Sequence, residues 1–378
     1  MLTIDGCRER RRRLFAALDD RTDWVLLSEP RHLMYFANFY ASPFIFRTQN
    51  ASALLVLGAD GSSALITDNM LGAYAQQAHV DDRIVANWYT GKGSAPERQS
   101  VLVEAGFMAM EARGGVHIGF DQMVPSELGL SLAYTRGGLQ PTFVNATVAI
   151  LMRQKDSDEI AVLRRGIGAM EAAFTAARDG IRPSMTELQA YTFVTGIVLD
   201  RLGEQALVYG DFASGPRVEK KGGPPTPRLI EKGDLFLLDY STVLYGYRGD
   251  FTNTWIVDGE PTSRQRELAS FCIEAMHEGE QLLKPGGRGH DIDAAVRRVF
   301  SQHGVLEHFP HHSGHGIGLG HPDPPYFTPG SEDVLMEGDV VTLEPGLYVD
   351  GVAGMRFERN YLITASGFEL LTHHHVGL

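Results

Sequence analysis

The 378-residue sequence predicts an α+β protein with a smaller N-terminal domain and a larger C-terminal domain built as a repeat. Three observations predict this fold. The chain is longer than one hydrophobic core usually serves. Short apolar runs separated by turn residues indicate antiparallel hairpins, and a helical pattern recurs within the second half. We place the domain boundary near residue 150, between 1–148 and 149–378.

The N-terminal domain is expected to be of the α/β type. The segments "DWVLLSE" and "GVHIGF" are typical strands, and "ASALLVLGADGSSALIT" predicts a hairpin because two apolar runs flank "GADGSS". Asp156 to Asp158 then precede apolar residues at helical spacing, which predicts a helix start just after the boundary.

Two similar helical segments indicate the repeat. Helices are expected over Met170–Gly180 and Met276–Gly286, each ended by glycine, and Met276 follows Met170 by 106 residues. A second helix start follows each, in "TELQAYTFV" and in "HDIDAAVRRVF". Chance similarity of two amphipathic helices is the alternative. If the repeat is real, the functional site should lie between its halves.

Each half is expected to end in antiparallel strands. The segment 234–258 is apolar and aromatic with Gly246 near its middle, so it should fold back as a hairpin. In the second half, "GDVVTLEPGLYV" and "GMRFERNYLIT" form the counterpart, joined through "DGVAG".

Composition excludes several classes of function. The 34 basic and 47 acidic residues give a net charge of −13, which disfavours nucleic acid or an anionic membrane as a partner. Two cysteines are too few for a Cys-based zinc site and favour a reducing, cytoplasmic location. No apolar stretch has the length of a signal peptide or membrane span. The arginine run of residues 8–13 is interpreted as a solvated helix face rather than a targeting patch.

Four acidic residues interrupt the strongest strands: Asp239, Asp250, Glu344 and Glu358. A buried carboxylate costs several kcal/mol, roughly, unless a partner offsets the penalty, and a bound cation is such a partner. With a turn near Tyr245, the two aspartates should lie roughly opposite each other on one face, with Cβ atoms about 5 Å apart. Carboxylates so placed can share two metal ions about 3.5–4 Å apart. Taken alone, either aspartate would be a turn or cap residue.

A histidine cluster supplies the remaining ligand. "PHHSGHGIGLGHPDPPYF" holds four of the fourteen histidines among glycines and prolines. Imidazole suits divalent Mn, Fe, Co or Zn, whereas an all-oxygen site would suit Mg or Ca. His315, between small residues, is expected to bind metal. His311 and His321 are candidates for contacts to substrate or to metal-bound water, and His312 is interpreted as a surface residue.

These motifs resemble the pita-bread metallohydrolases, which include methionine aminopeptidase, aminopeptidase P, prolidase and the metal-free creatinase. The resemblance rests on "LLDYSTVLYGYRGDFTNTW", "SGHGIGL", "LEPGLYV" and "GMRFERNYLIT" in this order, over roughly 150–370. It implies a pseudo-two-fold catalytic domain, a homodimer, and two divalent ions, Mn first and Co, Zn or Fe as alternatives. The implied ligands are Asp239, Asp250, His315, Glu344 and Glu358. Residues 1–145, with "EPRHLMYFANFY", resemble the creatinase-type N-terminal domain more weakly.

The resemblance also implies metal-assisted hydrolysis of an amide bond. Two cations would activate a bridging water and polarise the scissile carbonyl, while Glu344 relays a proton to the leaving nitrogen. His311 and His321 resemble the histidines that contact substrate and steady the oxyanion. Arg356 lies on the same strand face as Glu358 and is expected either to hold a substrate carboxylate or to buttress a ligand carboxylate.

Two departures concern substrate recognition. Proline-specific members carry a further histidine about 17 residues before the first aspartate, where this chain has Gly222 in the loop 213–228. The spacing from His315 to His321 is also one residue short. An Xaa-Pro peptidase therefore leads only narrowly over an enzyme for a small polar metabolite, resembling ectoine hydrolase, creatinase or dimethylsulfoniopropionate lyase. The lyase ranks lower because Ser241 stands where it has an extra aspartate. A binding module without catalysis is the third alternative.

Overall fold

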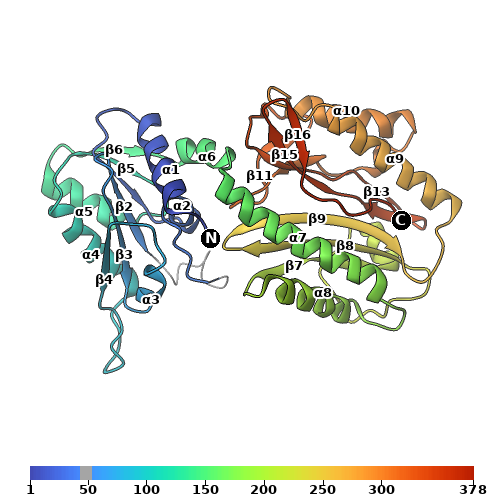
Figure 1. Cartoon of the computed structure of the whole chain (residues 1–378), viewed down its shortest axis with the longest axis horizontal. Coiled ribbons are helices and arrows are strands. Elements are labelled where there is room, and N and C mark those ends of the chain that lie inside the picture. The colour runs from blue at the N-terminus through green and yellow to red at the C-terminus, as the bar shows by residue number, and fades with distance from the viewer. Residues whose placement is uncertain (43–52) are drawn as a thin grey trace. The chain divides into compact units, whose positions relative to one another are not determined.

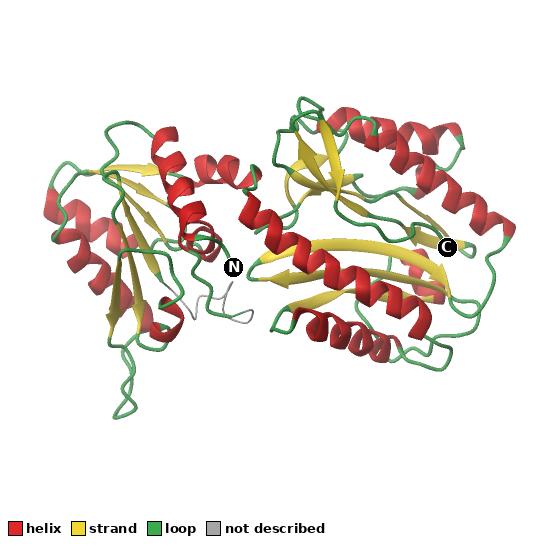
Figure 2. Ribbon diagram, in the orientation of Figure 1, coloured by secondary structure: helices red, strands yellow, loops and turns green. Residues whose placement is uncertain are grey.

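The computed structural model describes residues 1–42 and 53–378, and the chain divides into two compact units, Met1–Met152 and Arg153–Leu378 (Figure 1). Each unit combines a sheet with covering helices (Figure 2). Among the helices described, none is both long and apolar enough to cross a membrane.

Unit 1 is built on a six-stranded mixed sheet in the order β4-β3-β2-β1-β5-β6. The predicted hairpin is present, because β2 and β3 pair antiparallel with Leu57 opposite Ser63. The strands are β1 (Trp24–Leu27), β2 (Leu54–Gly58), β3 (Ser63–Asp68), β4 (Asp82–Ala86), β5 (His117–Phe120) and β6 (Gln140–Phe143). The helices are α1 (Ile4–Ala17), α2 (Pro30–Ala37), α3 (Gly72–Ala75), α4 (Arg98–Glu111), α5 (Ser126–Arg136) and α6 (Asn145–Arg153).

The arginine run lies on α1, as expected, but its interpretation as a solvated face is wrong for two residues. Arg10 is fully buried and Arg11 nearly so. The Arg10 guanidinium donates from Nε to the Tyr35 carbonyl at 2.8 Å, and Arg11 donates from Nη2 to the His79 carbonyl at 3.1 Å. Buried guanidinium groups need such acceptors, so these two arginines tie the helix to its unit.

Unit 2 contains two helix pairs, each followed by strands. Helices α7 and α8 pack together and contact the three-stranded sheet β7-β8-β9, and α9 and α10 pack together against the C-terminal strands. The first half comprises α7 (Ser157–Gly180), α8 (Glu187–Leu202), β7 (Leu207–Ser214), the 3₁₀ helix η2 (Gly215–Lys220), β8 (Leu235–Leu244) and β9 (Tyr247–Ile256). The second comprises α9 (Ser263–Glu280), α10 (Gly289–Gln302), the 3₁₀ helix η3 (Leu306–His308), β10 (Gly314–Gly316), β11 (Asp323–Phe327), β12 (Val340–Leu343), β13 (Gly346–Val349), β14 (Ala353–Arg356), β15 (Arg359–Thr364) and β16 (Gly367–Leu370).

The helix starts expected after Asp156 and in "TELQAYTFV" agree with the structure, but those expected at Met170 and Met276 are wrong, because α7 and α9 begin earlier, at Ser157 and Ser263. One predicted helix end is also wrong. Capping boxes begin α7 at Asp156 and α8 at Thr186. Helix α9 ends at Glu280, six residues before the predicted Gly286. Pro285 disfavours helical geometry in Lys284, which argues against a helix that continues to Gly286.

The β8–β9 hairpin turns at Tyr245 and Gly246, which both have positive φ (52° and 87°), as a two-residue turn of this kind requires. The turn lies where predicted, but the register differs by two residues. Asp239 pairs with Thr252, and Asp250 pairs with Ser241. Because side chains alternate with a period of two, the shift leaves both aspartates on one face of the sheet.

The predicted C-terminal hairpin is broken into two separate strand pairs. β12 pairs with β15 in a five-stranded sheet, and β13 pairs with β14 in a two-stranded sheet. Pro345, which has no N–H for a ladder, marks one break, and its carbonyl accepts from the Phe357 amide at the other break at 3.2 Å. Glu344 and Glu358 lie at these two breaks, outside regular strands.

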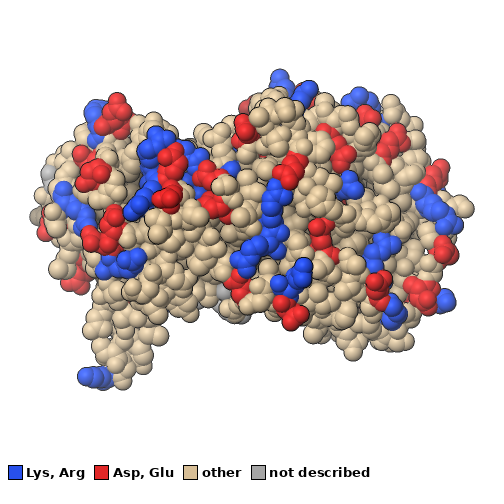
Figure 3. Space-filling view, viewed as in Figure 1, with Lys and Arg blue, Asp and Glu red and all other residues tan. Residues whose placement is uncertain are grey.

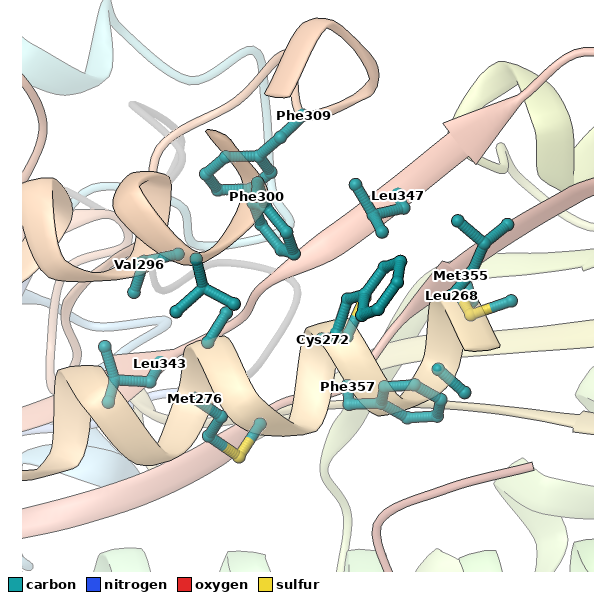
Figure 4. Close-up of a cluster of buried hydrophobic side chains, with 14 of the residues drawn as sticks. Leu268, Cys272, Met276, Val296, Phe300, Phe309, Leu343, Leu347, Met355 and Phe357 are labelled. Carbon is teal, nitrogen blue, oxygen red and sulfur yellow. The ribbon is translucent and has the colours of Figure 1, made fainter. Parts of the chain in front are cut away.

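A large apolar cluster packs α9 and α10 against the C-terminal strands (Figure 4). Leu343 and Phe357 are fully buried members of this cluster, and each directly precedes one of the two glutamates. Their burial fixes the backbone at both breaks and so positions Glu344 and Glu358.

On the face of unit 2 drawn in Figure 3, acidic and basic side chains are interspersed. The surface ion pairs of unit 2 include Arg164 with Glu369 at 2.7 Å and Arg264 with Glu267 at 2.6 Å. Surface charge in this view is therefore spread rather than gathered into one block.

Candidate metal centre

The predicted site residues line one cavity of unit 2, with a volume of about 460 Å³. Both halves of the unit contribute, since β8 and β9 supply two aspartates and the C-terminal half supplies the histidines and glutamates. The predicted residues on its wall are Asp239, Asp250, His311, His315, His321, Glu344, Arg356 and Glu358.

Asp250 is the common member of two groups whose possible ligand atoms lie within 4.8 Å of one another. One group joins it to Asp239 and Glu358, and the other joins it to His315 and His321. His315 Nε2 also lies 3.4 Å from Glu344 Oε1. A shared carboxylate between two ligand groups is the arrangement that two neighbouring cations require.

Two glutamate oxygens indicate that a metal ion would fit the site. Glu344 Oε1 and Glu358 Oε1 are buried and, within the described part of the chain, accept no hydrogen bond. Burial, reinforced by the charges of Asp250 and Asp239 and opposed by Arg356, raises the pKa of Glu344 to about 8. Burial and the same two aspartates raise the pKa of Glu358 well above its usual range. A divalent cation would supply the missing partner, and the mixed carboxylate and imidazole set suits Mn, Fe, Co or Zn.

The two aspartates, by contrast, have cationic or hydrogen-bonding partners. Asp239 is ion-paired with Arg356. Asp250 accepts from Ser241 Oγ at 2.8 Å, and its Oδ2 lies 2.6 Å from His321 Nε2. Burial disfavours the charge on Asp250, but the hydrogen bond and charge of His321, with Arg248 and His315, lower its pKa below the ordinary value.

Backbone carbonyls orient two of the histidines. Nδ1 of His315 lies 2.9 Å from the Gly316 carbonyl, and Nδ1 of His311 lies 2.8 Å from the His312 carbonyl. Each Nδ1 therefore carries the proton, which leaves each Nε2 as a free acceptor or metal ligand. Burial lowers the pKa of His315 to about 4 and that of His311 to about 3, so both rings are neutral near pH 7.

Arg356 has its guanidinium committed within the site. It pairs with Asp239, donates from Nη1 to the Tyr348 hydroxyl at 2.7 Å, and lies 3.9 Å from Glu344 through Nε. The Tyr348 hydroxyl in turn lies 3.1 Å from His311 Nε2, to which it can donate. Of the two roles left open by the sequence, these contacts favour buttressing of the carboxylates over binding of a substrate carboxylate.

The interpretation of His312 as a surface residue is wrong. Its side chain is partly buried on the cavity wall, with Nδ1 3.4 Å from Glu344 Oε1 and its ring 5.3 Å from the ring of His315. The irregular backbone before β10 turns this side chain inward, and the loop composition gave no sign of that direction.

Gly222 lies in the left-handed region with φ +103°, directly after the turn that ends η2. A Cβ at this position would lie 2.8 Å from Asp211 Oδ2. A histidine here would therefore require a shift of the Asp211 side chain and a strained backbone angle. Asp211 itself pairs with Asp239 across β7 and β8 and lines the cavity.

Four cavity residues were missed from the sequence: Tyr209, Asp211, Lys221 and Arg248. Tyr348, which contacts His311 and Arg356, was also missed. Arg248 could have been found, because it precedes Asp250 by two residues and so shares its strand face, the argument already used for Arg356. Asp211 and Lys221 lie in β7 and its following turn, which carried no clear strand signal.

Comparison with known proteins gives a consistent result. The model of Metallopeptidase family M24 matches residues 161–365. An Xaa-Pro dipeptidase from Bacillus anthracis is 26% identical with a TM-score of 0.82, covering 98% of this chain and 99% of that one. A prolidase from Pyrococcus horikoshii, 24% identical with a TM-score of 0.79 over 97% of this chain and 99% of its own, shares the fold.

Among curated proteins, an uncharacterized peptidase of Staphylococcus aureus is 30% identical over 236 residues. The match spans 61% of this chain and 66% of that relative. The fold class and the family resemblance predicted from the sequence are confirmed by these matches.

Proposed function

Because the chain belongs to Metallopeptidase family M24, we propose that it is a dinuclear metal-dependent hydrolase that cleaves Xaa-Pro peptides. The observation that carries the proposal is the pair of buried, unpartnered oxygens of Glu344 and Glu358 beside two aspartates and a neutral imidazole. The resemblance to an Xaa-Pro dipeptidase supports the substrate class.

Five residues would hold two divalent ions, with Mn as the first choice: Asp239, Asp250, His315, Glu344 and Glu358. Bound ions supply positive charge that activates water and polarises a carbonyl group. The remaining steps depend on the side chains of this chain.

Glu344 is proposed to carry a proton to the leaving nitrogen, because one of its oxygens faces the cavity without a hydrogen bond. His311 is held by the Tyr348 hydroxyl and the His312 carbonyl, and His321 by Asp250, so both rings have fixed directions. The N–H of each ring is already used, by the His312 carbonyl and by Asp250, so the role proposed for His311 and His321 is to contact and orient the substrate. Arg356 is a positioning residue, since it touches Asp239 and Tyr348.

A second candidate function follows from Gly222. This position has no imidazole and its backbone lies close to Asp211, so the substrate contacts differ from those expected for a proline-specific enzyme. This difference favours a small polar metabolite as the alternative substrate.

The test is metal analysis combined with turnover of glycyl-proline and an Xaa-Pro tripeptide with added Mn, for the wild type and for Asp250→Asn. We expect bound metal and turnover in the wild type and loss of both in the variant. Undiminished activity of Asp250→Asn would refute the site. Turnover of small amides or betaines without peptide cleavage would establish the alternative, and absence of metal and turnover would indicate a binding module.

A further inference from the structure

The cavity wall contains cationic groups beyond Arg356. Arg248 and Lys221 both line it, and across the described residues neither forms an ion pair with a carboxylate. Positively charged side chains on a cavity wall that have no anionic partner in the protein are suited to bind a negatively charged ligand.

Arg248 is fixed by contacts that leave part of its guanidinium free. Its Nε donates to Ser241 Oγ at 2.7 Å, and its guanidinium carbon lies 4.8 Å from the centre of the Tyr209 ring. The Ser241 hydroxyl in turn donates a hydrogen bond to Asp250 Oδ1. The two Nη groups have no hydrogen-bond partner among the described residues, so a planar fork with a fixed direction remains available.

Arg356 does not offer such a fork, because Nη1 serves Tyr348 and Nη2 serves Asp239. Lys221, at the end of η2 with φ 74°, adds a second positive charge to the same cavity. Of the two arginines on the described cavity wall, Arg248 is therefore the one whose Nη groups are available to an anionic group.

We propose that Arg248, assisted by Lys221, binds a carboxylate of the substrate. The proposal rests on the proposed function and narrows it: the preferred substrate is a short molecule with a free carboxylate, such as a dipeptide, rather than a longer or C-terminally blocked peptide. Arginine pairs with carboxylate through two parallel N–H···O bonds, which gives direction as well as charge.

The experiment compares glycyl-proline with glycyl-prolinamide, which differ only in the carboxylate. In the wild type we expect kcat/KM for the acid to exceed that for the amide by about 10- to 100-fold, the effect of a hydrogen-bonded charge. Arg248→Gln should remove this preference mainly through a higher KM for the acid, so that the ratio of kcat/KM for acid and amide approaches one. Arg248→Lys should restore part of the preference, and Lys221→Gln should lower it less.

Arg264→Gln is the matched control, because it removes an exposed arginine paired with Glu267 on α9. Its kinetics should equal those of the wild type. If the wild type cleaves both peptides equally well, or if Arg248→Gln keeps the preference for the acid, the inference is wrong while the proposed function stands.

A binding measurement separates the two proposals. L-proline and L-prolinamide are titrated into the metal-free protein and followed by NMR. Preferential binding of L-proline that Arg248→Gln abolishes would uphold the inference even if no peptide were cleaved, in which case the proposed function would fall. If the wild type binds L-proline no more tightly than L-prolinamide, or if Arg248→Gln keeps the preference for L-proline, the inference is overturned.

Discussion

The aspartates of the β8–β9 hairpin and the glutamates of the C-terminal half reach the same cavity by different routes. Asp239 and Asp250 lie inside long, regular strands, where the alternation of side chains directs both to one face. Glu344 and Glu358 lie at breaks between short strands, where buried Leu343 and Phe357 fix the backbone.

The two pairs also differ in their partners. Each aspartate meets a cationic or hydrogen-bonding side chain, whereas each glutamate has an oxygen with no hydrogen bond among the residues described. The aspartates are therefore balanced by side chains of the protein, whereas under the proposed function a bound cation would balance the glutamates. The predictions below test this division.

The largest expected effect is on catalysis. Glu344→Gln removes both a metal ligand and the proposed proton carrier, so kcat should fall by at least about 10²- to 10⁴-fold. Turnover of glycyl-proline at saturating Mn measures it, with the exposed Glu337→Gln as the control. A loss below tenfold would remove Glu344 from the chemistry.

The next effect concerns stability of the metal-free protein. Asp239→Asn leaves the buried Arg356 guanidinium without its main partner and should lower the free energy of unfolding by about 3 kcal/mol. Glu358→Gln should change it by under about 1 kcal/mol, because the lost oxygen had no partner. Urea unfolding in the presence of a chelator measures both. Equal losses would contradict the division between the two pairs.

A smaller effect is expected from the group that orients Glu358. Thr252 donates from Oγ1 to Glu358 Oε2 at 2.7 Å, so Thr252→Val should weaken metal affinity by about 10- to 100-fold. Thr242→Val is a matched control on the same hairpin, since the buried Thr242 hydroxyl has no hydrogen-bond partner in the described structure. Metal titration should show an affinity loss only in the first variant.

The smallest effect concerns a buried histidine outside the site. His374 packs against Phe174 and Phe251, and burial, with Arg359 and nearby charges, lowers its pKa from 6.5 to about 3. Its nearest carboxylate oxygen, on Glu171, is 3.9 Å from Nδ1.

Because the folded pKa of His374 lies below the unfolded one, its contribution to stability is present above pH 6.5 and is lost as the pH falls toward 3. At pH 5.5 the loss should be about 1.4 kcal/mol. His374→Phe should remove this part of the acid sensitivity, measured by unfolding at pH 7.5 and 5.5. The same sensitivity in the variant would assign it to other groups.

The sequence predicted the site residues that interrupt apolar strands. A carboxylate buried in such a run is energetically costly, so its presence indicates a partner such as a metal ion. It did not predict the register of Asp239 with Thr252, which depends on the two-residue turn at Tyr245 and Gly246. It also missed the strand break at Pro345, although proline there argues against a continuous strand. The alternation of apolar and polar residues does not determine the register of a hairpin or the position of a strand break.

Residues brought in by long-range folding were harder to predict. Asp211 lies beside Asp239 only because β7 pairs with β8, and His312 turns inward only in the folded loop. Arg248 was accessible from strand alternation, but its free Nη groups become evident only when its neighbours are known.

The close approach of Gly222 to Asp211 has a consequence for changing substrate preference. A single Gly222→His replacement would place its Cβ 2.8 Å from Asp211 Oδ2 at a backbone angle that L side chains rarely adopt, so Asp211 and the local backbone would have to shift. A histidine here is therefore expected to need a second change, at position 211 or in the path of the loop.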